Sequence, residues 1–171
     1  YLLAHTKRQT VKVVKGWRGL SRGVFLVNCL AIVYDRQKIL IGKRVLDPYI
    51  KNLGWGFPGG RPVYQKPLED SLRNEVKKKT GIDIQVLGLY HARLFPRKPR
   101  FLLLYYLATP IGGELRSGEK FAEVKWINPR SAEDYFTTPI DEVIRNLLRT
   151  LDENPRKVLS IFEEGEDIGH A

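Results

Sequence analysis

The sequence has little cysteine and no long apolar run, and both absences narrow the classes of protein it can encode. Its single cysteine, Cys29, excludes an intramolecular disulfide and a cysteine-based metal site, and it is compatible with a reducing compartment. No stretch reaches the roughly 18 consecutive apolar residues of a membrane-spanning helix. The first residues, YLLAHTKRQ, lack the pattern of a secretory signal. We therefore expect a cytoplasmic protein with no membrane partner.

Acidic residues are scarce outside the C-terminal end. All 29 Lys and Arg residues lie in positions 1–160, together with only 15 of the 19 Asp and Glu residues, so this part of the chain carries a net charge of +14. Such a surface favours polyanionic partners such as nucleotides and nucleic acid. The same charge is also typical of a well-solvated surface, and charge alone does not separate the two interpretations.

The order of elements predicts an α+β fold. The length of 171 residues is typical of one domain, and there are no internal repeats or low-complexity linkers. Two segments have helical periodicity, residues 68–80 and 139–154. Apolar runs bounded by turn residues predict strands at 25–34, 38–44, 55–57, 82–95, 100–109 and 121–127. An edge strand around Val11, Val13 and Val14 and a loop over 45–54 complete the expected arrangement, a mixed β-sheet between helices (α/β/α).

Each helix has a predicted buried face. Pro67 and Gly81 bracket the first helix, and Leu68, Leu72 and Val76 recur every four residues along it. The second helix opens at TPID, residues 138–141, with capping chemistry. Its expected apolar face consists of Ile140, Val143, Ile144, Leu147, Leu148 and Leu151.

The stretch GWGFPGGRPVYQKPLEDSLRNEVKKKTGI, residues 54–82, has the layout of a phosphate-handling motif. Gly60 begins and Gly81-Ile82 end the pattern G-x5-E-x7-R-E-U-x-E-E-x-G-U, in which U is a bulky apolar residue. With KILIGKR and AEVKW on either side, residues 24–151 resemble the Nudix hydrolase superfamily. The resemblance implies the Nudix fold. We expect an N-terminal extension at 1–23, a Nudix domain at 24–154 and a tail at 155–171 that is acidic at its end.

Basic residues replace most of the acids that the Nudix pattern contains. The substituted positions are Lys66 for the first Glu, Asn74 for Arg, and Lys78 and Lys79 for the paired Glu. The resemblance implies that the family's carboxylates hold a divalent metal at a pyrophosphate and help to activate water. Mg²⁺ prefers carboxylate and water oxygens, whereas a charged ammonium cannot serve as a ligand. We therefore expect metal-dependent hydrolysis to be weakened or lost.

Two acids remain as candidate metal ligands, Glu75 in the helix and Glu119 before the last strand, and Mg²⁺ is expected only if activity remains. Glu75 has a second interpretation as the partner of Lys79 in an i, i+4 ion pair. The run of lysines at 77–79 also has a structural interpretation, because basic side chains stabilise the C-terminal end of a helix dipole.

Basic and aromatic residues predict a ligand site. The pair GKR and PGGR also looks like the GDP-mannose mannosyl hydrolase branch, which implies that arginines assist departure of the nucleotide. The catalytic candidates are Glu75, Arg61, Arg44 and His91. The substrate-binding candidates are Arg44, Trp55, Gly60, Arg61, Lys78, Lys79 and Tyr90. His91 suits a general base or a packed strand position, and Trp55 suits stacking on a ligand or plugging the core.

Two functions remain open. The first is a protein of the Nudix hydrolase lineage that binds a nucleoside-diphosphate-linked ligand, such as a nucleotide sugar, in a basic cleft. The second is a non-catalytic module that binds RNA or a protein on the same scaffold. A basic cluster surrounds a predicted turn and has two aromatic residues beside it, which is compatible with single-stranded RNA and equally with a solvated hairpin tip. Its residues are Arg93, Arg97, Lys98 and Arg100, with Phe95 and Phe101 adjacent.

Overall fold

The computed structural model describes residues 23–45 and 54–163, so the predicted edge strand and most of the predicted loop lie outside the described residues. The strands are β1 (Leu26–Asp35), β2 (Lys38–Arg44), β3 (Trp55–Gly56), β4 (Gly59–Gly60), β5 (Ile82–Phe95), β6 (Lys98–Gly113) and β7 (Phe121–Ile127). The helices are α2 (Leu68–Thr80), the 3-10 helix η1 (Pro129–Ser131), α3 (Ala132–Tyr135), α4 (Glu142–Glu153) and α5 (Arg156–Glu163).

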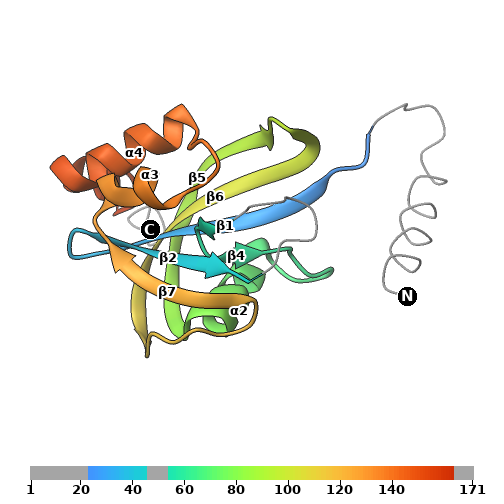
Figure 1. Cartoon of the computed structure of the whole chain (residues 1–171), viewed down its shortest axis with the longest axis horizontal. Helices are drawn as coiled ribbons and strands as arrows, with labels where there is room; N and C mark the ends of the chain where they lie inside the picture. The colour runs from blue at the N-terminus through green and yellow to red at the C-terminus, as the bar shows by residue number, and fades with distance from the viewer. Residues whose placement is uncertain (1–22, 46–53, 164–171) are drawn as a thin grey trace, which may run out of the picture.

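A mixed β-sheet lies between helices, which confirms the expected α+β arrangement (Figure 1). The strand order is β3-β2-β1-β6-β5, with β4 paired to β1 and β7 paired to β2. Strands β1 and β6 run parallel, and the other described pairs are antiparallel. Helix α2 covers one face, and α3 and α4 cover the other. No helix among residues 23–45 and 54–163 is long and apolar enough to cross a membrane.

Strand β1 is buried on both faces, which explains its uninterrupted apolar sequence. Cys29, Ala31 and Val33 pack with the core beneath α2. Leu30 and Ile32 alternate with them and pack with the core beneath α4. The strand therefore joins the two halves of the hydrophobic core.

Helix α2 has the predicted bounds, but its predicted buried stripe is wrong at Leu68. Gly81 ends the helix with φ 76°, and its N–H donates to the carbonyl oxygen of Lys77. Leu72 and Val76 are buried, whereas Leu68 is 39% exposed. The first turn of the helix is exposed throughout, so the buried face starts one turn later. It includes Ser71, whose Oγ accepts a hydrogen bond from the N–H of Val63 in the preceding loop.

Helix α4 begins at Glu142, and the carboxylate of Asp141 caps it by accepting a hydrogen bond from the N–H of Val143. Ile144, Leu147, Leu148 and Leu151 are buried as predicted, and Ile140 packs with them just before the helix. Val143 is 41% exposed, contrary to prediction, because it lies beside the cap at the edge of the apolar stripe.

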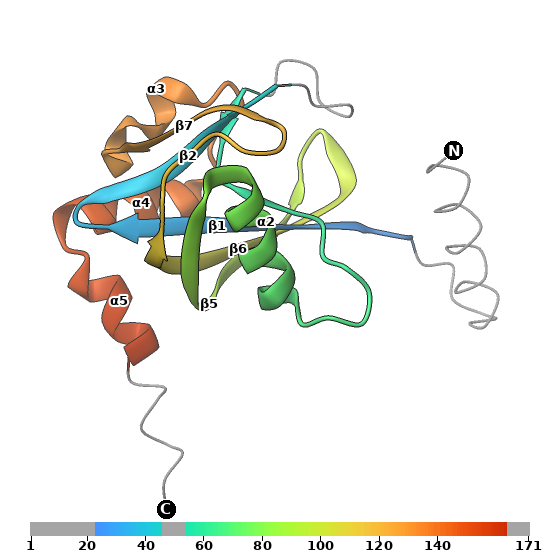
Figure 2. The same ribbon diagram turned by 90° about the horizontal axis from the view of Figure 1, so that it is seen from below.

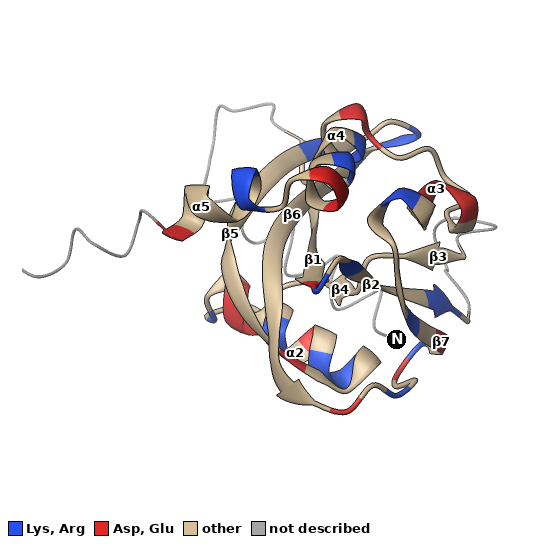
Figure 3. Ribbon diagram, turned by 90° about the vertical axis from the view of Figure 1, so that its left-hand side faces the viewer, with Lys and Arg blue, Asp and Glu red and all other residues tan. Residues whose placement is uncertain are grey.

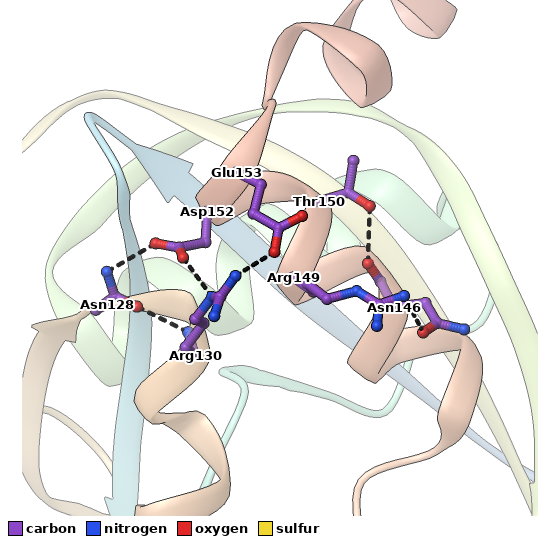
Figure 4. A network of polar contacts seen from close by, with 7 residues as sticks. All are labelled: Asn128, Arg130, Asn146, Arg149, Thr150, Asp152 and Glu153. Carbon is purple, nitrogen blue, oxygen red and sulfur yellow. Dashed lines mark hydrogen bonds and ion pairs between the residues drawn. The ribbon is translucent and has the colours of Figure 1, made fainter.

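A polar network ties η1 to the end of α4 (Figure 4). Arg130 contacts Asp152 at 2.6 Å and also pairs with Glu153. Asn128 donates to the other Asp152 oxygen at 2.9 Å and accepts from the N–H of Arg130. These contacts fix the chain between β7 and α4. The same segment contributes Phe136 and Ile140 to the pocket described below.

Helix α5 falls within the segment that the sequence assigns to the tail, and it was not foreseen as a helix. It lies at one end of the molecule (Figure 2). Val158 is buried, and Phe162 packs so closely on Gly88 of β5 that a Cβ there would lie 2.6 Å from the ring. Strand β5 has four register shifts against β6 and forms one end of the described strand order.

The buried thiol of Cys29 generates a prediction about alkaline pH. Its side chain is fully buried, and burial raises the pKa of the thiol from 9.0 to about 11. A raised pKa contributes stability that is present below pH 9 and is lost as the pH rises through about 11. The difference in unfolding free energy between the wild type and Cys29→Ala should therefore shrink by about 2–3 kcal/mol over this range. Urea denaturation at pH 8, 9.5 and 11 tests this, and a constant difference would contradict it.

Candidate functional site

A pocket of about 460 Å³ lies where α2, β4, the β5–β6 hairpin and the chain before α4 meet. The charged lining residues from β2, the chain after β4, α2 and the chain before β7 are here called the basic end: Arg44, Arg61, Glu75, Lys79 and Lys120. The packed rings of Phe57, Tyr105 and Phe136, which also line the pocket, are here called the aromatic end. Figure 3 shows α2 and the chain leading into β7 side by side, each carrying basic residues.

Lys79 is a largely enclosed cation of the basic end, with 14% of its side chain exposed. Its ammonium donates a hydrogen bond to the carbonyl oxygen of Gly59 and lies 3.3 Å from Oε2 of Glu75. The predicted i, i+4 pair is thus present. Burial lowers the pKa of Lys79, Glu75 opposes this effect, and the nearby charges of Arg44 and Lys120 lower the pKa further.

The neighbouring lysines have different surroundings. Lys77 lies at the end of α2, where its ammonium contacts the carbonyl oxygen of Gly81 at 3.2 Å and Asp83 at 2.7 Å. Lys78 is 55% exposed, and its ammonium lies 3.8 Å from Oε1 of Glu75. Only Lys79 of the three lines the pocket. The run of lysines therefore combines a role at the helix end with one inward-facing charge.

Two glycines of β4 allow close approaches, one to β1 and one to α2. A Cβ at Gly59 would lie 2.0 Å from the carbonyl oxygen of Cys29, because β4 pairs directly with β1. A Cβ at Gly60 would lie 2.6 Å from Oε2 of Glu75. Gly60 thus leaves room for the carboxylate beside the backbone, and both glycines line the pocket.

The residues present do not suit a divalent metal. Both oxygens of Glu75 face ammonium groups, at 3.3 and 3.8 Å. Glu119 is exposed, and its described contact is a hydrogen bond from its backbone N–H to the carbonyl oxygen of Lys78. Within residues 23–45 and 54–163, no three His, Cys, Asp or Glu side chains are grouped as metal ligands. A hard cation needs several oxygen ligands. Here ammonium groups hold Glu75, and the other carboxylate of the pocket, Asp141, contacts Arg93 and His91.

The aromatic end is built from three segments far apart in the sequence. Phe57 lies edge-on to Phe136 at 5.0 Å and to Tyr105 at 6.3 Å between ring centroids. Arg93 donates from Nε to the hydroxyl of Tyr105 at 3.3 Å and lies 3.7 Å from Asp141. Two of these five residues had a signal in the sequence, Arg93 in the basic cluster around the predicted turn and Asp141 at a helix start. No sequence pattern pointed to Phe57, Tyr105 or Phe136.

Several predicted site residues lie at or behind the pocket. Arg44, Arg61, Trp55 and Gly60 line it, as do Glu75 and Lys79. The Trp55 ring also packs edge-on against Tyr135 at 5.3 Å and carries the Lys125 ammonium 4.9 Å from its centroid. Trp55 therefore lines the pocket, as stacking on a ligand would require, and is also packed against neighbouring side chains.

His91 and Tyr90 do not line the pocket. His91 Nε2 lies 3.2 Å from Asp141, and its ring stacks on Tyr105 at 6.1 Å. Tyr90 packs against the core beneath α4. His91 thus contacts two residues of the pocket lining, Asp141 and Tyr105, without lining the pocket itself.

Comparison with known proteins identifies the family. The model of the NUDIX domain matches residues 24–150, so the chain belongs to this family. A NUDIX hydrolase from Nitrosomonas europaea shares 19% identity with a TM-score of 0.61, covering 79% of this chain and 74% of that one. A MutT NUDIX hydrolase from Burkholderia pseudomallei shares 23% identity with a TM-score of 0.56, covering 74% and 98%.

A solved structure of a UDP-X diphosphatase shares 15% identity with a TM-score of 0.52, covering 96% of this chain and 78% of that one. At these identities the three structures show a common fold. No curated protein sequence matches the chain.

Asp141 caps α4 and also contacts Arg93 and His91. Two substitutions can separate the effect of the cap from that of the charge. Asp141→Asn keeps an oxygen that accepts from Val143 and removes the negative charge facing Arg93 and His91. Asp141→Ala removes both. We expect Asp141→Ala to unfold with about 1 kcal/mol less free energy than Asp141→Asn, which is the contribution of the cap. Urea denaturation measures both variants, and equal stability would show that the cap contributes nothing.

Proposed function

We propose that this NUDIX-domain protein binds a nucleoside-diphosphate-linked ligand, with the diphosphate at the basic end and the nucleoside at the aromatic end. The observation that carries the proposal is that one pocket joins Arg44, Arg61 and Lys120 to Phe57 and Tyr105. Its volume lies within the usual range of small-molecule sites. The UDP-X diphosphatase with the same fold supports a nucleotide ligand.

The two ends suit the two chemistries of such a ligand. Arginine offers a planar fork of donors that matches phosphate oxygens, and Arg44 and Arg61 enter the pocket from β2 and from the chain after β4. Aromatic rings bind the faces of a base or sugar. The Arg93–Asp141 pair adds polar atoms to the aromatic end, where they would orient the ligand.

Metal-dependent hydrolysis is weakened or lost in this proposal. The ammonium groups of Lys78 and Lys79 hold Glu75, the acid that remains in the motif. Without a bound metal, the strongest source of charge neutralisation and water activation is missing. Any remaining turnover would resemble that of the GDP-mannose mannosyl hydrolase branch, in which arginines assist departure of the nucleotide. Arg44 and Arg61 would then stabilise the negative charge on the leaving nucleoside diphosphate.

An RNA-binding module is the second candidate function. Phe95 and Phe101 line the same pocket, and Arg97 and Arg100 are exposed on the hairpin that carries them. Aromatic and basic side chains in this order suit stacking bases and a phosphate backbone. The two candidates differ in whether a mononucleotide alone is sufficient for binding.

A thermal-shift screen tests the proposal. The probes are GDP, UDP, their sugar conjugates and a short single-stranded RNA, each with Mg²⁺ and with EDTA. We expect a nucleotide or nucleotide sugar to raise the melting temperature equally under both conditions, because a ligand of the native state stabilises it by mass action. Stabilisation by RNA alone would favour the second candidate. A rise that requires Mg²⁺ would contradict a metal-free site.

Two arginine variants locate the diphosphate. Arg44→Ala and Arg61→Ala should each weaken nucleotide binding by about tenfold, since a charge-assisted hydrogen bond contributes about 1.5–3 kcal/mol. Arg149→Ala is the matched control, because Arg149 is exposed on α4 and hydrogen-bonds to Asn146 outside the pocket (Figure 4). Calorimetric titration measures the three affinities. Equal affinities for all three variants would place the diphosphate elsewhere.

A further inference from the structure

The ammonium of Lys79 has the surroundings of a bound cation. It contacts the carbonyl oxygen of Gly59 and the carboxylate of Glu75, which come from two different elements, β4 and α2. Carbonyl and carboxylate oxygens are also the ligands that hard divalent cations take. Lys79 lies one helical turn from Glu75. The positive charge between Glu75 and Gly59 therefore belongs to a side chain of the protein.

The basic end leaves this cation facing the pocket. The charges of Arg44 and Lys120 both act on Lys79, so the three groups lie near one another. All three line the same pocket, and the Lys79 side chain retains 14% exposure. Glu75 balances only one of the two ammonium charges that Lys78 and Lys79 bring to it, and an anionic ligand would balance the other.

We propose that Lys79 is a tethered replacement for a divalent cation: its ammonium occupies the cation position between Glu75 and Gly59 and turns its charge toward the phosphate groups of the ligand. The phosphate part of this inference rests on the proposed function, whereas the exclusion of metal does not. The site is then complete without a metal ion, and Lys79 excludes one both by charge and by occupying the oxygens that would bind it.

Replacing Lys79 should allow a metal ion to bind between Glu75 and Gly59. Lys79→Glu places a second carboxylate one turn from Glu75 and frees the carbonyl oxygen of Gly59. Lys157→Glu is the matched control, because it makes the same change of charge at an exposed residue of α5 that does not line the pocket. Lys78 is not a suitable control, because its ammonium lies 3.8 Å from Oε1 of Glu75.

Mn²⁺ titration followed by electron paramagnetic resonance measures this directly, since bound Mn²⁺ loses the signal of the free ion. We expect Lys79→Glu to bind Mn²⁺ at least about tenfold more tightly than the wild type or Lys157→Glu. Adding Glu75→Gln to Lys79→Glu should abolish the gain. Equal binding by Lys79→Glu and Lys157→Glu would overturn the inference, because it would reflect overall charge rather than this position.

The wild type provides a test that does not depend on how well the variants fold. An excess of Mn²⁺ should leave its melting temperature unchanged. Tight binding of Mn²⁺ to the wild type that Glu75→Gln removes would overturn the inference, since the position would then admit a metal beside Lys79. These titrations contain no nucleotide, so they are independent of the nucleotide screen. A negative screen with the expected Mn²⁺ result would reject the proposed function and leave the exclusion of metal in place.

Discussion

The burial of β1 on both faces is the constraint on which the site depends. Gly59 and Gly60 pair with Leu30 and Cys29 of this strand, and the N–H of Ala31 donates to the carbonyl oxygen of Pro58 at 2.8 Å. The backbone oxygen that Lys79 contacts is thereby fixed to the centre of the core. Helix α2 packs on the same face of β1, so the distance between Glu75 and β4 follows from core packing.

The elements of the fold could be predicted where local pattern alone determines them. Strands β2, β5 and β7 and helix α2 have the predicted bounds, because alternation, helical periodicity and the Pro67 and Gly81 boundaries lie within each segment. Helix α5 could not be predicted in this way. Its position depends on packing against Gly88, which is distant in the sequence. Exposure of Leu68 likewise depends on where α2 lies over the sheet.

The candidate site likewise contains residues that local sequence predicts and residues that depend on the fold. Arg44, Arg61, Glu75 and Lys79 follow from the spacing of one motif and its flanking strand, and the structure brings them into one pocket. The aromatic end could not be inferred, because the pairing of β6 in the sheet and the chain before α4 bring Tyr105 and Phe136 to Phe57. Sequence spacing also did not show that Lys79 faces inward while Lys78 faces solvent.

The irregular pairing of β5 has a consequence for self-association. A long strand at the end of a sheet exposes backbone donors and acceptors, and a straight one is a template on which another chain can add a strand. The register shifts at Asp83/Ile84, Val86/Gly88, Leu89/His91 and Leu94/Phe95 interrupt that template along its whole length. One of these shifts adjoins Gly88, on which Phe162 packs, so β5 is an irregular strand and a poor template for edge-to-edge pairing.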